Sequence, residues 1–146
     1  GFVRRPAAWW KSFRDFHTSS KPRCDGRAVR VHDLTVLMAD CVDLYDLSAN
    51  DFVKEMVERH PGFYSRMLKC YYPEGKDWWV GHQEQLEQHL FDYCEMRGFS
   101  VPKKIGKENV SKPMKPGNLY PKTIARVEEL ESYCLTRFYE KSSIQC

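Results

Sequence analysis

Apolar residues recur at intervals of three and four along much of this chain, which is the spacing of one face of an α-helix. In residues 33–45 this stripe consists of Leu34, Leu37, Met38, Cys41, Leu44 and Tyr45. In the last part of the chain it consists of Ile124, Val127, Leu130, Cys134, Leu135 and Phe138. Few segments alternate as strands do, and the best candidate is the short run RAVRV at 27–31. The pattern predicts an all-α fold.

Helix start and stop signals divide the first half of the chain. Ser48 is followed three residues later by Asp51, which is the pattern of an N-cap that begins a helix. That helix is expected to end before Pro61, because a residue that precedes proline avoids the helical conformation. A third, shorter helix is expected over residues 61–70.

Two further helices follow. Asp77 can cap a long helix that ends at Gly98, with Trp79, Leu86, Leu90 and Tyr93 facing inward. Pro121 occupies a position that suits the first turn of the last helix. We therefore expect a small bundle of about four helices, with a C-terminal helix tethered to it.

Charge is unevenly distributed and supports a division into four segments. Residues 1–31 carry eight Lys or Arg against two Asp, residues 32–100 carry a net charge of −7, and residues 101–146 carry +4. We interpret residues 1–31 as an extended basic arm and residues 32–100 as an acidic helical body. Residues 101–119 are rich in Lys and Pro and are interpreted as a connector, and residues 120–146 form the C-terminal helix. Basic flanks are either solvated or lie against something anionic.

The first 23 residues have the composition of a mitochondrial import signal, which is rich in Arg and Ser and poor in acid. The run from Arg14 to Ser19 resembles the Arg-x-Phe-x-x-Ser signal for two-step mitochondrial processing. We interpret this region as an import segment whose distal part remains on the mature protein as an ordered arm. A cytosolic or viral protein with a basic tail is the alternative.

Six cysteines are spaced irregularly, at positions 24, 41, 70, 94, 134 and 146. These gaps fit neither the odorant-binding disulfide pattern nor the twin C-x9-C hairpin. Because Cys41, Cys94 and Cys134 fall on or beside apolar stripes, we expect free thiols in a reducing compartment.

Residues capable of catalysis or metal binding form only weak patterns. His82 and His89 are seven residues apart on one expected helix, which predicts a separation of roughly 10 Å, too far for a shared metal ion. The acidic run from Asp40 to Glu55 lacks the glycine and terminal glutamate of an EF-hand. The Gly and Lys residues of 98–107 lack the spacing of a phosphate-binding loop. We expect no cofactor, no metal and no catalytic activity.

The sequence favours a non-catalytic accessory subunit of a large mitochondrial assembly, on the matrix side of the inner membrane. A respiratory complex or the ATP synthase would be the host, and the longest apolar runs are too short to span a bilayer. The expected contacts with other subunits, or with anionic lipid head groups, are Arg4, Arg5, Trp9, Trp10, Lys11, Arg14, Lys103 and Lys104. The alternative is a mitochondrial ribosomal protein whose basic arms bind rRNA. An enzyme or small-ligand carrier is a third possibility.

Overall fold

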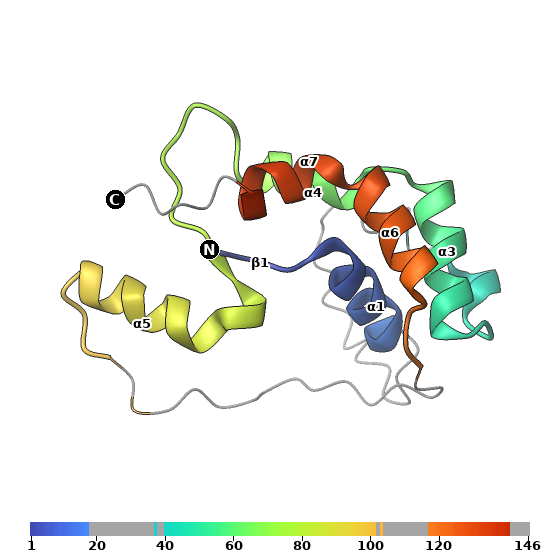
Figure 1. The fold of residues 1–146 in the computed structure, drawn as a ribbon, viewed down its shortest axis with the longest axis horizontal. Helices are drawn as coiled ribbons and strands as arrows, with labels where there is room; N and C mark the ends of the chain where they lie inside the picture. Colours follow the sequence, from blue (N-terminus) through green and yellow to red (C-terminus); the bar gives the residue numbers. More distant parts are fainter. Residues whose placement is uncertain (18–36, 38–39, 102, 104–116, 141–146) are drawn as a thin grey trace, which may run out of the picture.

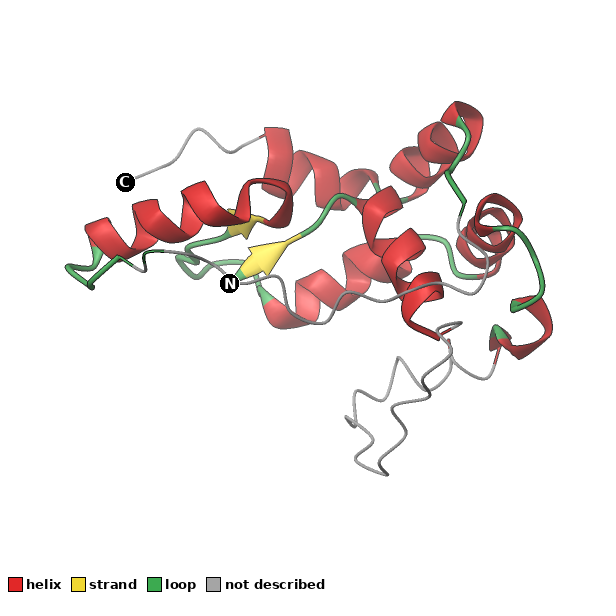
Figure 2. Ribbon diagram, turned by 90° about the horizontal axis from the view of Figure 1, so that it is seen from below, coloured by secondary structure: helices red, strands yellow, loops and turns green. Residues whose placement is uncertain are grey.

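The structure, a computed structural model, describes residues 1–17, 37, 40–101, 103 and 117–140. Helices account for most of these residues, which confirms the helical class (Figure 2). The segment RAVRV at 27–31 lies outside the described residues. So do much of the expected first helix, most of the connector and the last six residues.

The two central helices follow their sequence signals closely. Helix α3 (Ala49–Arg59) begins at Ser48, whose hydroxyl accepts a hydrogen bond from the Asp51 amide at 3.1 Å. It ends at His60, directly before Pro61, as predicted. Helix α4 (Phe63–Tyr71) begins two residues later than predicted, because Gly62 takes a left-handed conformation with φ 68°. The short 3-10 helix η1 (Val42–Leu44) lies before α3.

The last helix is interrupted. Helix α6 (Pro121–Leu130) begins with Pro121 in its first turn, as predicted. It stops at Glu131, and the chain continues as α7 (Ser132–Leu135) and a π-helical turn, η3 (Thr136–Glu140). Helix α6 packs on α1 and α3, and α7 packs on α4 (Figure 1). The C-terminal helix thus packs into the core, and most of the connector that was expected to tether it lies outside the described residues.

The prediction of an extended arm over residues 1–31 is wrong for its first half. A short strand β1 (Phe2–Val3) leads into helix α1 (Pro6–His17). Residues 7, 10, 13 and 14 of α1 are buried, and Trp10 has no exposed surface. Residues 6–17 therefore form one amphipathic helix, whose apolar side faces the core although the segment also carries basic residues.

The prediction of one helix over residues 77–97 is also wrong in its first half. Residues 77–80 are not helical, and β2 (Gly81–His82) pairs in parallel with β1, with Phe2 opposite Gly81. A Cβ atom at Gly81 would lie 2.5 Å from the Phe2 ring, so the close approach of the two strands suits glycine. A 3-10 turn, η2 (Gln83–Gln85), then leads into helix α5 (Leu86–Met96). Gly98, with φ 67°, follows its C-terminus as predicted.

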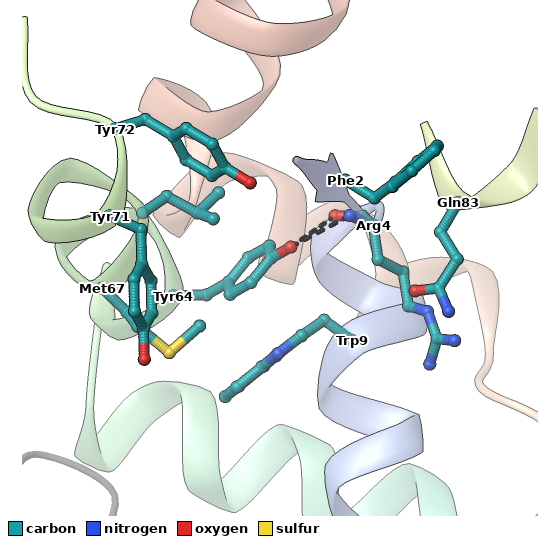
Figure 3. A pocket seen from close by; sticks show the side chains of 9 residues that line it. Phe2, Arg4, Trp9, Tyr64, Met67, Tyr71, Tyr72 and Gln83 are labelled. Carbon is teal, nitrogen blue, oxygen red and sulfur yellow. Dashed lines mark hydrogen bonds between the residues drawn. The ribbon is translucent and has the colours of Figure 1, made fainter. Parts of the chain in front are cut away.

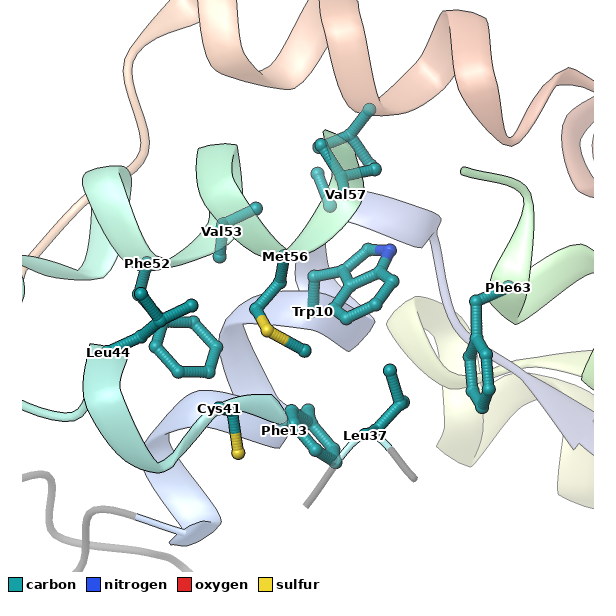
Figure 4. Packing of buried hydrophobic residues seen from close by; sticks show 12 residues of the cluster. Trp10, Phe13, Leu37, Cys41, Leu44, Phe52, Val53, Met56, Val57 and Phe63 are labelled. Carbon is teal, nitrogen blue, oxygen red and sulfur yellow. The ribbon is translucent and has the colours of Figure 1, made fainter. Parts of the chain in front are cut away.

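Two apolar clusters hold these elements together. The larger is formed mainly by α1, α3 and residues around η1, and Trp10 lies at its centre beside Met56 and Val57 (Figure 4). The smaller joins β1, α4 and the C-terminal turns through Val3, Tyr64, Leu68, Cys134 and Phe138.

A buried carboxylate connects the C-terminal helices to the start of α4. Glu131 has no exposed surface and accepts hydrogen bonds from the backbone amides of Tyr64 at 3.1 Å and Ser65 at 2.8 Å. It also lies 3.4 Å from the indole nitrogen of Trp10, which donates to it. Because Gly62 has no side chain with which to cap α4, Glu131 satisfies the amides that a helix leaves free in its first turn.

Candidate functional site

Three of the four basic side chains that the structure describes in residues 1–17 are paired within the chain. Lys11 lies 2.6 Å from Asp15, and Arg5 lies 3.6 Å from Glu128. Arg14 is fully buried, donates to the Leu47 carbonyl at 3.1 Å and lies 3.3 Å from Asp15. The charges that were expected to attach a partner are therefore largely used to fasten α1 to its own surroundings.

Two of the predicted partner contacts are wrong in this structure. Trp10 and Arg14 expose no surface, because the helical spacing of α1 directs them into the larger core. A residue without exposed surface cannot touch another molecule unless the fold opens. Lys103 is exposed, and Lys104 lies outside the described residues.

Arg4 and Trp9 are brought together at one surface cavity of about 400 Å³. Its walls come from the N-terminal segment, from α4 and the residue that follows it, and from Gln83 (Figure 3). The side chains that line it are Phe2, Arg4, Trp9, Tyr64, Met67, Leu68, Tyr71, Tyr72 and Gln83. We call this cavity the aromatic pocket.

The base of the aromatic pocket is a stack of two rings. Trp9 and Tyr64 lie 4.7 Å apart between centroids, with 20° between their planes. Tyr64 is almost fully buried, and its hydroxyl both donates to the Arg4 carbonyl and accepts from the Arg4 amide, each at 3.0 Å. Burial raises the pKa of Tyr64 well above its usual range, so this hydroxyl stays protonated and can serve both bonds.

The tyrosines of the pocket were not among the predicted site residues. The third helix was expected to end at residue 70, whereas Tyr71 is the last residue of α4 and Tyr72 caps it. The signal that could have identified them is the helical spacing of Tyr64, Leu68 and Tyr71, which places all three on one side of α4.

A second candidate surface lies at the far end of α5. Met96 is 55% exposed, Phe99 57% and Val101 42%, although all three are apolar. Phe99 is held at the helix end by a hydrogen bond from its amide to the Cys94 carbonyl at 2.8 Å. The other apolar residues of this helix, Leu86, Leu90, Phe91 and Tyr93, belong to neither core cluster. We call Met96, Phe99 and Val101 the α5 patch.

The two histidines lie closer together than predicted. Their ring centroids are 5.0 Å apart, because His82 belongs to β2 rather than to α5. The His82 amide donates to Nδ1 of His89 at 2.7 Å, and Nε2 of His82 donates to the Phe138 carbonyl at 2.6 Å. Each imidazole ring thus makes a hydrogen bond to the backbone of the chain. Among the described residues no three His, Cys, Asp or Glu side chains are grouped so that they could hold a metal ion.

The cysteines at 41, 70, 94 and 134 are all free thiols, and the other two lie outside the described residues. Burial raises the pKa of Cys41, and it raises the pKa of Cys134 to about 12. Cys70 is exposed.

In the part of the chain that the structure describes, no helix is long and apolar enough to cross a bilayer. Comparison with protein families, with curated proteins and with solved structures found no match to this chain.

Proposed function

We propose that this protein is a non-catalytic accessory subunit of a large mitochondrial inner-membrane complex, a respiratory complex or the ATP synthase, on its matrix side. The observation that carries the proposal is the α5 patch. Met96, Phe99 and Val101 lie within six residues of one another along the chain, and each is exposed. They follow the end of α5, a helix whose ribbon lies apart from α1, α3 and α6 (Figure 1). Exposed apolar groups that gather in one place are typical of surfaces that contact another protein.

The position of α5 supports this interpretation. Its contacts with the chain are mainly with β2 and η2, and its apolar residues belong to neither core cluster. Trp79 covers Tyr93 at 4.6 Å between ring centroids, while Phe99 beyond it remains exposed. A partner subunit that covered the α5 patch would complete the packing of this helix.

The structure changes which residues are proposed to make the attachment. Arg4, Arg5, Trp9 and Lys11 retain some exposed surface, but Trp10 does not. We therefore assign the apolar anchoring to the α5 patch rather than to the tryptophan pair. The mitochondrial location rests on the composition of residues 1–23, and anionic lipid head groups remain proposed contacts for the exposed lysines.

The test is sedimentation of an epitope-tagged chain from detergent-solubilised mitochondria. We expect the tagged chain to migrate with an inner-membrane complex. A triple variant, Met96→Ser with Phe99→Ser and Val101→Ser, should move to the free fraction while its melting temperature stays almost unchanged, because exposed substitutions rarely alter stability by more than about 0.5 kcal/mol each.

The matched control is Val42→Ser, which removes an apolar side chain that is 63% exposed but lies on η1. This variant should remain with the complex. The proposal fails if the triple variant also remains with the complex. Sedimentation of the unchanged chain with ribosomes would favour the rRNA-binding alternative instead.

A further inference from the structure

The geometry points to a function for the aromatic pocket that is separate from assembly: it binds a small flat organic anion, an aromatic ring that carries one carboxylate or phosphate. Its volume of about 400 Å³ lies within the range of small-molecule sites. The proposal rests on three features, namely ring walls, a fixed backbone and an unpaired guanidinium.

The aromatic side chains that line the cavity suit the flat, apolar part of such a ligand. Trp9 also stacks on Phe13 at 5.6 Å, in addition to its stack on Tyr64, so its ring is held on a packed support. Tyr71 borders the cavity on the side opposite the Arg4 side chain (Figure 3) and is 50% exposed, which leaves part of its ring available to the far end of a ligand. Aromatic side chains bind flat rings by offset stacking or by edge-to-face contact.

The backbone at Arg4 is fixed on both sides. Its amide and carbonyl are both bonded to the Tyr64 hydroxyl, and the next amide, of Arg5, donates to Glu84 at 2.6 Å. These bonds use the main chain only and leave the Arg4 side chain free to act on a ligand.

The Arg4 guanidinium has no hydrogen bond or ion pair within the described residues, although it lines the aromatic pocket. The neighbouring Arg5, by contrast, is paired with Glu128. Glu84, which lies close to this segment, already accepts hydrogen bonds from the Arg5 amide and from the Tyr139 hydroxyl at 3.0 Å. A guanidinium in this position is suited to a bidentate bond with carboxylate or phosphate.

Isothermal titration calorimetry with two pairs of probes tests the proposal. Naphthalene-2-carboxylate and adenosine monophosphate supply the two anions, and 2-naphthalenemethanol and adenosine are their uncharged counterparts. We expect one of the anions to bind with an affinity at least about tenfold higher than its uncharged counterpart, since an ionic hydrogen bond contributes on this scale. The anion that binds identifies carboxylate or phosphate as the preferred group.

Three substitutions test whether the probes bind in the aromatic pocket. Arg4→Gln should weaken the anion about tenfold and bring its affinity close to that of the uncharged probe. Tyr71→Ala should weaken both members of a pair. Arg97→Gln, which alters an exposed arginine beyond the end of α5, should change neither. Because the Arg4 side chain makes no internal bond, Arg4→Gln should keep the melting temperature of the unchanged protein.

The proposal is overturned if neither anion binds, if charged and uncharged probes bind equally, or if Arg4→Gln leaves the anion's affinity unchanged. None of these results bears on the α5 patch, whose test uses other residues and another readout.

Discussion

Glu131 offers the sharpest test of how this fold is held together. Its carboxylate is the acceptor for two backbone amides at the start of α4 and for the Trp10 indole. Glu131→Ala would leave both amides buried without an acceptor and would open space beside Trp10. Each buried amide that loses its acceptor costs about 1–3 kcal/mol.

We therefore expect Glu131→Ala to lower the free energy of unfolding by about 4 kcal/mol, a large share of the stability of an ordinary domain. Glu131→Gln has nearly the same shape and retains one acceptor oxygen, but it presents an NH2 group to the second amide. Its expected cost is about 2 kcal/mol, which is a fall of about 6 °C in melting temperature for a chain of this size.

Thermal unfolding followed by circular dichroism provides the measurement. The matched control is Glu129→Gln, two residues earlier, where the side chain is 68% exposed and lies 2.8 Å from Arg126. An exposed ion pair of this kind contributes at most about 1 kcal/mol. If Glu131→Gln and Glu129→Gln melt at the same temperature, the carboxylate does not cap α4 as described.

Two further predictions concern the core. Trp10→Ala should cost about 3–5 kcal/mol in denaturant unfolding, whereas Trp78→Ala, at a side chain 43% exposed, should cost far less; equal losses would contradict the central position of Trp10. The second concerns the thiols. In the native protein at mildly alkaline pH, iodoacetamide followed by mass spectrometry should label Cys70 well before Cys134, whose pKa is raised to about 12 by burial. The unfolded thiol ionises at a pH of about 8.5, so stability should fall as the pH rises from that value toward the folded pKa, and Cys134→Ala should reduce that fall. Equal labelling of both thiols, or a pH dependence that the variant does not alter, would contradict this assignment.

The sequence identified those elements whose signals are local. Ser48 and Pro61 bound α3, Gly98 follows the end of α5, and Pro121 begins α6. Each of these signals works through the backbone of its own neighbourhood, so it can be recognised without knowledge of the rest of the fold.

The errors concern contacts between distant segments. The strand pairing between Phe2 and Gly81 displaced the expected helix start at Asp77, and no local signal announces a pair 79 residues apart. Likewise, a charged residue such as Arg14 or Glu131 is ordinarily exposed, and only the packing of α1, α4 and α6 explains why both are buried.

The candidate site was predicted in part. Arg4 and Trp9 were chosen because they are basic and aromatic, and both line the aromatic pocket. The spacing of Tyr64 and Tyr71 places both on one side of α4, but which segment that side contacts depends on the packing of α4 against the N-terminal segment. The α5 patch was missed because Met96, Phe99 and Val101 lie outside the apolar stripe of residues 79, 86, 90 and 93, and no local signal marks them as a contact surface.

The bond between Trp10 and Glu131 spans 121 residues of chain. During translation, helix α1 is made more than 100 residues before α6 and α7, which complete its surroundings. Until residues 121–140 leave the ribosome, the apolar face of α1 lacks part of its cover and is available to chaperones or to other nascent chains. Closing such a distant contact is also slow compared with forming a local helix, because the chain entropy is lost before the contact is gained. Biosynthesis of this protein should therefore depend on protection of helix α1 until the later segments that cover it have been made.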